Sequence, residues 1–362
     1  MSSGWAGGGH YNGPFMPHHS ETPDARRAQL EDWLRGELKL KLELAGVVPA
    51  SADASFRRYF RAHARGQSYI VMDAPPGRED LGPFVSVAAA LGGIGVNVPA
   101  VLEADRERGF LLLTDLGSTL YLEALAAPGE VDALYRDATA ALLLIQSRGL
   151  AAAADLAPYS RALLERELGL FPEWFLGRHL GEPPAAAEGD LLERTAACLT
   201  DAALEQPQVF VHRDFHSRNL MRTALRNPGV LDFQDAVRGA LTYDLVSLFK
   251  DCYVAWPRAR VLGWVLDYRR CALAAGLAIP GSEADFVRAF DLMGVQRHLK
   301  VLGIFARLWY RDGKASYLRD LPLVLDYVLA TTPEYAELAE LDRFLRAAVV
   351  PRFAAAQARA LN

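Results

Sequence analysis

The stretch His212-Arg213-Asp214-Phe215-His216-Ser217-Arg218-Asn219 decides the fold class of this sequence. It follows directly on Val209-Phe210-Val211, a short apolar run of β-branched and aromatic residues that predicts a buried strand. Asp214 and Asn219 both come after the predicted end of that strand. The sequence therefore predicts a polar loop that brings an acid and an amide close together.

A second acid follows after a predicted hairpin. Asn227-Pro228-Gly229 is a turn signal, and a short apolar run leads from it to Asp232. Asn219 and Asp232 would then offer one neutral and one anionic oxygen ligand, which suits Mg²⁺ because this ion takes few protein oxygens and completes its shell with phosphate and water. We expect Asn219 and Asp232 as metal ligands, and Asp214 as the base that accepts a proton from an incoming hydroxyl.

The order of these residues resembles the signature of the protein-kinase-like fold, H-R-D-x-x-x-x-N followed by an Asp-Phe pair. Asp232-Phe233-Gln234-Asp235 and Tyr243-Asp244-Leu245 make the sequence similar to the aminoglycoside phosphotransferase and choline kinase family of small-molecule kinases. The resemblance implies ATP and Mg²⁺ as cofactors. It also implies an α+β, two-lobed fold with a small N-terminal antiparallel-sheet lobe and a larger, mostly helical C-terminal lobe. Asp235 would face the acceptor or support the site from behind.

Further segments resemble one branch of that family, the bacterial kinases that phosphorylate the anomeric hydroxyl of N-acetylated amino sugars in cell-wall recycling. The likeness covers about residues 25–345 and is carried by 55–61, 71–76, 109–117 and 297–308. It implies N-acetylmuramate or N-acetylglucosamine as acceptor and the sugar α-1-phosphate as product. Two alternatives stay open: a phosphotransferase for an aminoglycoside, choline or homoserine, and a catalytically weak pseudokinase that serves as a binding module.

The predicted nucleotide site departs from the general kinase pattern. The first lobe has no G-x-G-x-x-G, and no lysine lies between residues 42 and 249, so the strand expected to carry the phosphate-pairing lysine has none. We expect Arg57 or Arg58 to replace it, because an arginine fork binds phosphate oxygens; a solvated face is the alternative. The resemblance implies two groups of nucleotide-binding residues. Those over the phosphates are Ser55, Phe56, Arg57, Arg58 and Tyr59, and those at the adenine are Leu113, Thr114, Asp115 and Leu116.

The acceptor site is expected in the second lobe. An anionic sugar acid needs a locally positive pocket, whereas a polycationic aminoglycoside needs an acidic one. The helix predicted over 283–308 offers three cations in four residues, of which only one or two can face the site because adjacent helical positions diverge. The candidate substrate contacts are His216, Asp235, Asp251, Arg297, His298 and Lys300. Tyr253 and Trp256 are more simply explained as core residues.

Composition fits this interpretation. The chain has 362 residues, is 51% hydrophobic and carries a formal net charge of −5, which indicates a globular protein of two lobes without nucleic acid or an anionic membrane as its main partner. Its three cysteines are widely spaced and encode neither a disulfide framework nor a zinc site. We expect a cytoplasmic monomer, with 1–22 as a flexible tail or cloning remnant, 23–116 as the nucleotide-binding lobe and 117–362 as the catalytic and sugar-binding lobe.

Hydrophobic periodicity predicts the elements of both lobes. In the first lobe it favours a helix over 26–44, strands over 55–62 and 68–73 joined by a turn at 65–67, a helix over 79–91, and strands over 96–102 and 109–114. The second lobe is predicted to be mostly helical, except between 208 and 232. Its predicted helices run up to 150 and over 159–168, 191–204, 241–253, 262–275, 283–308 and 342–360.

Overall fold

A computed structural model of the chain describes residues 23–38, 42–52, 56–153 and 155–361, so the tail predicted over 1–22 lies outside the described residues. The chain forms two compact units, Met1–Glu79 with Ala104–Leu112, and Asp80–Glu103 with Leu113–Asn362. No helix in the described part of the chain is both long and apolar enough to span a bilayer.

The first unit is built on a β-sheet. In the described residues the sheet has five strands in the order β1-β2-β3-β5-β4, and β1 pairs antiparallel with β2 as β2 does with β3. The turn between β2 and β3 has Arg65 and Gly66 at φ 57° and 74°, the left-handed geometry that matches the twist of a tight hairpin. The strands are β1 (Leu42–Ala52), β2 (Arg58–Ala64), β3 (Gln67–Asp73), β4 (Val101–Asp105) and β5 (Phe110–Thr114).

The helix predicted over 26–44 is wrong in its second half. Helix α1 covers Pro23–Asp32 and continues as a helical segment over Trp33–Glu37, after which the chain enters β1 at Leu42. Trp33 and Leu34 are buried against the sheet, so the apolar spacing is helical up to that point. Beyond it, Leu42-Glu43-Leu44 alternates apolar and polar residues, a period that fits a strand as well as a helix.

Helix α2 (Leu81–Gly93) belongs to the second unit, although it was predicted as part of the N-terminal lobe. Its N-terminus is capped by Asp80, whose side chain accepts from the Gly82 N–H at 2.8 Å. Phe84 of α2 packs on Phe233, beside the predicted metal ligand Asp232, with ring centroids 5.0 Å apart. The compact units therefore do not divide at residue 116.

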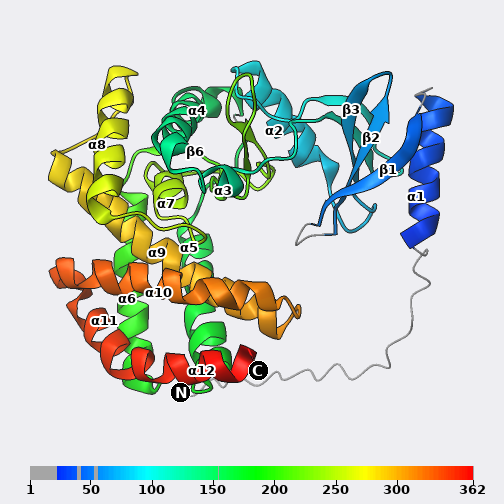
Figure 1. Cartoon of the computed structure of the whole chain (residues 1–362). Helices are drawn as coiled ribbons and strands as arrows, with labels where there is room; N and C mark the ends of the chain where they lie inside the picture. The colour runs from blue at the N-terminus through cyan, green and yellow to red at the C-terminus, as the bar shows by residue number, and fades with distance from the viewer. Residues whose placement is uncertain (1–22, 39–41, 53–55, 154, 362) are drawn as a thin grey trace, which may run out of the picture. The chain divides into compact units, whose positions relative to one another are not determined.

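The rest of the second unit is mostly helical, as predicted (Figure 1). The helical segments Phe171–Leu180 and α10 were not predicted; the proline in each lies in the first turn, where helices tolerate it. The helices are α3 (Tyr121–Ala124), α4 (Val131–Ala152), α5 (Arg161–Leu168), α6 (Ala186–Leu204), α7 (Tyr243–Phe249), α8 (Arg258–Ala274), α9 (Glu283–Tyr310), α10 (Leu321–Thr331), α11 (Ala339–Phe344) and α12 (Val350–Leu361).

Helix α9 forms the centre of this unit. It packs against α6, α7, α10 and the segment Phe171–Leu180, and its residues from Phe290 to Gly303 are buried on all sides. A helix that is buried all round has no solvent face for its polar residues. Those polar residues therefore have partners in the interior or line a cavity.

Two short ribbons hold the loop that decides the fold class. Strand β6 (Gln208–Val211) pairs with β9 (Val237–Ala240), and β7 (Leu220–Met221) pairs with β8 (Gly229–Val230), all antiparallel. The strand before the loop and the hairpin after it are thus both confirmed. The loop 212–219 and Asp232 are held between these ribbons and the start of α7.

Candidate active site

The backbone of the loop is held by Asp244, the acid of the Tyr243-Asp244-Leu245 motif. Its carboxylate accepts from the His212 N–H at 2.7 Å and from the Arg213 N–H at 3.0 Å. Arg213 has φ 77°, a conformation that a non-glycine residue adopts only when its surroundings impose it. Burial raises the pKa of Asp244 to about 7, against these two hydrogen bonds and the charge of Arg297. Asp244 therefore fixes the backbone of the loop at His212 and Arg213. The sequence showed the motif but not this role.

Asp214 lies at the surface of the loop with 44% of its side chain exposed. The Arg297 Nη2 atom lies 3.6 Å from its Oδ1, and the His216 Nε2 atom lies 4.0 Å from the same oxygen. Partial burial alone would raise the pKa of Asp214, but the charges of Arg297, His216, Lys300 and Arg213 together outweigh that effect and lower it. The carboxylate is therefore ionised at neutral pH, which is the state that its predicted role as base requires.

Asn219 and Asp232, the two predicted metal ligands, are in contact. The Asn219 amide donates to the Asp214 carbonyl at 3.0 Å and to Asp232 Oδ2 at 3.3 Å, and the Gln234 amide donates to Asp232 Oδ1 at 2.6 Å. Asp232 has φ 60°, so the backbone here is again held in the left-handed region.

The donor chemistry around Asp232 fits a magnesium ion. The Asn219 amide nitrogen makes both hydrogen bonds, which leaves its oxygen for a cation, and the buried Gln234 Oε1 has no hydrogen-bond partner in the described chain. A carboxylate with neighbouring amide oxygens is a hard ligand set of the kind Mg²⁺ prefers. No cluster of three or more His, Cys, Asp or Glu able to hold a metal occurs among the described residues.

A buried charge cluster lies under the loop. The Arg213 guanidinium donates to Glu167 Oε1 at 2.6 Å, and Lys300 Nζ lies 3.0 Å from Glu167 Oε2. Lys300 also donates to the Tyr243 hydroxyl at 3.0 Å, and the Tyr159 hydroxyl donates to Glu167. Burial would raise the pKa of Glu167, but the charges of Lys300 and Arg213 lower it. Glu167 is therefore an ionised counter-ion; it is an ordinary acid on a predicted helix, and no sequence signal marks it.

Arg297 joins this cluster to the predicted base. It is 4% exposed, and its Nη1 donates to the Arg213 carbonyl at 2.8 Å and to the Tyr243 hydroxyl at 3.1 Å, while Nη2 faces Asp214. The guanidinium thus fixes both the loop backbone and the carboxylate. It touches the predicted catalytic group as well as lining the cavity described next.

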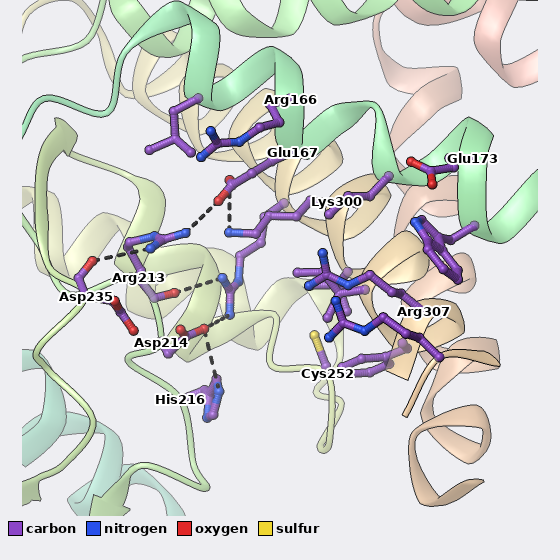
Figure 2. Close-up of a pocket in the computed structure, with 18 of the residues that line it drawn as sticks. Arg166, Glu167, Glu173, Arg213, Asp214, His216, Asp235, Cys252, Lys300 and Arg307 are labelled. Atoms are coloured by element: carbon purple, nitrogen blue, oxygen red, sulfur yellow. Dashed lines mark hydrogen bonds and ion pairs between the residues drawn. The ribbon is translucent and has the colours of Figure 1, made fainter. Parts of the chain in front are cut away.

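A cavity of about 700 Å³ opens beside Asp214 within the second unit (Figure 2). Of the predicted substrate contacts, Arg297, Lys300, His216 and Asp235 line it. Tyr253, which was expected in the core, lines it as well, together with apolar side chains from α5, α9 and the segment 171–180. Among the described residues its charged lining comprises the six cations Arg166, Arg213, Arg297, Lys300, Arg307 and Arg311 and the four acids Glu167, Glu173, Asp214 and Asp235.

Asp251 and His298 lie away from the cavity, so the expectation that they contact substrate does not fit the structure. Asp251 is buried and accepts from the Ser217 N–H at 2.9 Å and the Tyr253 N–H at 3.1 Å, which makes it a second brace of the loop. His298 is buried, lies 3.0 Å from the Lys250 carbonyl and stacks on Tyr327. Both are polar residues satisfied in the interior.

Trp256 is half-buried and packs against aromatic neighbours rather than lining the cavity. It donates to the Tyr135 hydroxyl at 2.7 Å and lies edge-on to Trp264.

In the first unit, the arginines predicted to bind phosphate have acidic partners. Arg57 Nε donates to Glu79 at 3.1 Å, and Arg58 Nε donates to Asp73 at 2.9 Å. Phe56 is 59% exposed and donates its N–H to Glu79 at 3.2 Å, and Ser55 lies outside the described residues.

The four predicted adenine contacts, Leu113 to Leu116, come at the end of β5 and just after it. The Thr114 N–H donates to the Ala100 carbonyl at 3.0 Å, and Asp115 accepts from the Gly117 N–H at 2.9 Å.

Comparison with known proteins agrees with this geometry. The model of the phosphotransferase enzyme family matches residues 46–278. The chain is 50% identical to the N-acetylmuramate/N-acetylglucosamine kinase of Pseudomonas aeruginosa over 88% of its own length and 96% of that protein, and 49% identical to the enzyme of the same name from Pseudomonas putida over 92% and 99%.

Solved structures show the same fold at low identity. The ADP-bound aminoglycoside phosphotransferase APH(2'')-Ib has a TM-score of 0.55 at 15% identity, covering 83% of this chain and 97% of that one. A choline kinase from Streptococcus pneumoniae has a TM-score of 0.52 at 12% identity, covering 83% and 99%. The fold and the site thus define a small-molecule kinase of the protein-kinase-like class. The chain belongs to the phosphotransferase enzyme family, which confirms the predicted fold class and enzyme class.

Proposed function

We propose that this enzyme transfers the γ-phosphoryl group of ATP to the anomeric hydroxyl of N-acetylmuramate and N-acetylglucosamine, producing ADP and the sugar α-1-phosphate. The proposal draws its acceptors from the relatives at about 50% identity, whose names state these two sugars. The observation that carries it is the excess of cationic side chains around the cavity beside Asp214. A cytoplasmic location and a monomeric state stay predictions.

The charge of the cavity separates the possible acceptors. N-acetylmuramate carries a carboxylate, whereas aminoglycosides and choline are cations. A cationic acceptor in this cavity would meet Arg297 and Lys300 on α9, and like charges in a partly desolvated site repel. The aminoglycoside phosphotransferases and the choline kinase therefore share the fold with this chain, but their acceptors do not fit its cavity as well as a sugar acid does.

In the proposed reaction Asp214 orients the sugar hydroxyl and takes its proton as the new P–O bond forms. Arg297, 3.6 Å from Asp214, holds the carboxylate ionised and in place. The lowered pKa of Asp214 makes it a weak base. A weak base suffices because an anomeric hydroxyl is more acidic than an ordinary alcohol and because orientation supplies much of the rate enhancement.

The cofactors are assigned to the residues predicted to bind them. Asn219 and Asp232 would hold Mg²⁺, which when bound neutralises charge on the transferred phosphoryl group. The segments 55–59 and 113–116 would bind ATP. Arg57 and Arg58 have the acids Glu79 and Asp73 as partners, so binding of a phosphate by either arginine would exchange one anionic partner for another.

The acceptor is tested by measuring ADP release from the full-length protein with ATP, Mg²⁺ and one of N-acetylmuramate, N-acetylglucosamine, kanamycin or choline. We expect release with the two sugars and none above background with the two cations. Turnover of kanamycin or choline at a higher kcat/KM than either sugar would replace this proposal by one of the alternatives. ATP binding without turnover of any acceptor would favour the pseudokinase.

A further inference from the structure

Arg307 lines the cavity, and its side chain has neither a hydrogen-bond nor an ion-pair partner among the described residues. It lies in the last turn of α9, is half-buried, and lines the cavity. Its Nε atom is buried and makes no hydrogen bond, and no ion pair joins its guanidinium to any acid in the described part of the chain. A partly desolvated guanidinium without an acceptor is costly, which marks Arg307 as a group whose partner comes from outside the protein.

Most of the other cations that line the cavity have acidic partners. Arg213 and Lys300 share Glu167, and Arg297 faces Asp214. Arg311, one turn after Arg307, is paired with Asp312 at 2.7 Å. Arg166 makes no ion pair within the described residues, but it is exposed and water can satisfy it. The uncompensated and partly buried charge is therefore at Arg307.

The surroundings of Arg307 favour an anion. Burial lowers the pKa of its guanidinium, and the charge of Arg311 lowers it further, while the acids Asp312 and Glu173 oppose the shift only in part. The C-terminal end of a helix favours a positive charge, which explains why a cation is tolerated here. It does not explain why two arginines, at i and i+4, face one cavity, since like charges at this spacing destabilise a helix.

The cavity runs along one face of α9 from Asp214 to Arg307. The lining residues Arg297, Lys300, Ile304, Arg307 and Arg311 follow one another at steps of three or four, which keeps them on one side of the helix. Arg297 and Arg307 are ten residues apart, or about 15 Å along the axis. Figure 2 shows Arg307 across the cavity from Arg213 and Asp235. A sugar with its reacting hydroxyl at Asp214 would extend toward Arg307.

We propose that Arg307 binds the carboxylate of the lactyl group of N-acetylmuramate while the anomeric hydroxyl of the same sugar lies at Asp214. This inference rests on the proposed function and names the group that separates its two substrates. N-acetylglucosamine has a hydroxyl in place of the lactyl ether, so it lacks the anion. Arg307 is thus a specificity-determining residue for the sugar acid and contributes nothing to the neutral sugar.

The test compares Arg307→Gln with the parent enzyme, using kcat/KM for both sugars. We expect at least about a tenfold loss with N-acetylmuramate, the scale of one hydrogen bond to a charged group, and a change within about twofold with N-acetylglucosamine. Arg307→Lys should fall between the two enzymes because it keeps the charge but not the fork. Arg288→Gln is the matched control: Arg288 lies on the same helix, is paired with Glu337 on the surface and does not line the cavity. It should leave both sugars unchanged.

The methyl ester of N-acetylmuramate gives the complementary change in the substrate. For the parent enzyme, kcat/KM should fall on going from acid to ester by about the factor that Arg307→Gln loses with the acid. The variant should have about the same kcat/KM for acid and ester. The effects of the substitution and of the ester are therefore not additive. Equal losses for both sugars in Arg307→Gln would make Arg307 structural, and unchanged kinetics with the acid would also overturn the inference. Failure of the parent enzyme to phosphorylate either sugar would refute the proposed function itself, a result visible before any variant is made.

Discussion

Glu167→Gln tests the cluster that holds the catalytic loop. The substitution keeps the shape of the side chain but removes the negative charge that pairs with both Arg213 and Lys300. The Glu167 oxygens lie 2.6 Å from Arg213 Nη2 and 3.0 Å from Lys300 Nζ. The side chains of Glu167 and Lys300 are 8% and 7% exposed, so water cannot replace the carboxylate. Loss of one partner of a buried ion pair costs about 3–5 kcal/mol. Because the Arg213 side chain keeps 21% exposure, we expect the lower end, about 3 kcal/mol.

The measurement is the free energy of unfolding in urea at neutral pH, followed by circular dichroism. Glu165→Gln is the matched control, since Glu165 lies on the same helix but forms an exposed pair with Arg161 at 3.4 Å. An exposed pair contributes at most about 1 kcal/mol. Equal losses in the two variants would refute the assignment of Glu167 as a buried counter-ion.

The difference in unfolding free energy between the parent protein and Glu167→Gln should depend on pH. The pKa of Glu167 is lowered in the folded protein, so the native state binds fewer protons than the unfolded chain. Its stabilising effect is then fully present above the ordinary glutamate pKa of about 4.3 and is lost as the pH falls through the folded value. The stability difference between the parent protein and Glu167→Gln should shrink below about pH 4. A difference that grows toward acid would contradict this sign.

The remaining predictions concern the reaction. Asp214→Asn should keep ATP binding, measured by calorimetry, and lose at least about a hundredfold in kcat, in line with general-base contributions; near-normal turnover would remove Asp214 from that role. Arg57→Ala or Arg58→Ala should raise the KM for ATP at least about tenfold in one of the two variants, and an unchanged KM in both would sink the idea that arginine replaces the missing lysine. Asp232→Asn should raise the Mg²⁺ concentration needed for half-maximal rate by at least about tenfold, whereas an unaltered metal titration would exclude Asp232 as a ligand.

The central residues of the site could be predicted because their chemistry is encoded locally. Asp214, Asn219 and Asp232 belong to one loop and one hairpin, where the residue types and their spacing follow directly from the strand and turn signals. The structure places Asn219 and Asp232 in contact through a hydrogen bond of 3.3 Å. The motif acid Asp244 was visible in the sequence, but its two hydrogen bonds to the loop backbone depend on where the start of α7 lies relative to the loop.

The lining residues on α5 and on the segment 171–180 could not be predicted, because these elements lie far from the loop in the sequence. Glu167 on α5 reaches Lys300 on α9 across more than a hundred residues of sequence. His298 illustrates the limit of helical periodicity: α9 is buried on all sides, so spacing alone could not tell a residue stacked on Tyr327 from one facing the cavity. The predicted helix was extended wrongly through Leu42 for a related reason. Leu42 and Leu44 on either side of Glu43 fit the period of a strand as well as that of a helix.

The most direct test of the proposed activity is the position of the phosphate in the product. The enzyme would be incubated with ATP, Mg²⁺ and N-acetylmuramate, and the product examined by phosphorus NMR. A phosphorus signal coupled to the anomeric proton of an α-configured sugar, appearing together with ADP in equal amount, is the result predicted here. Phosphate on another hydroxyl of the sugar, or ATP consumption that does not depend on the sugar, would contradict the account.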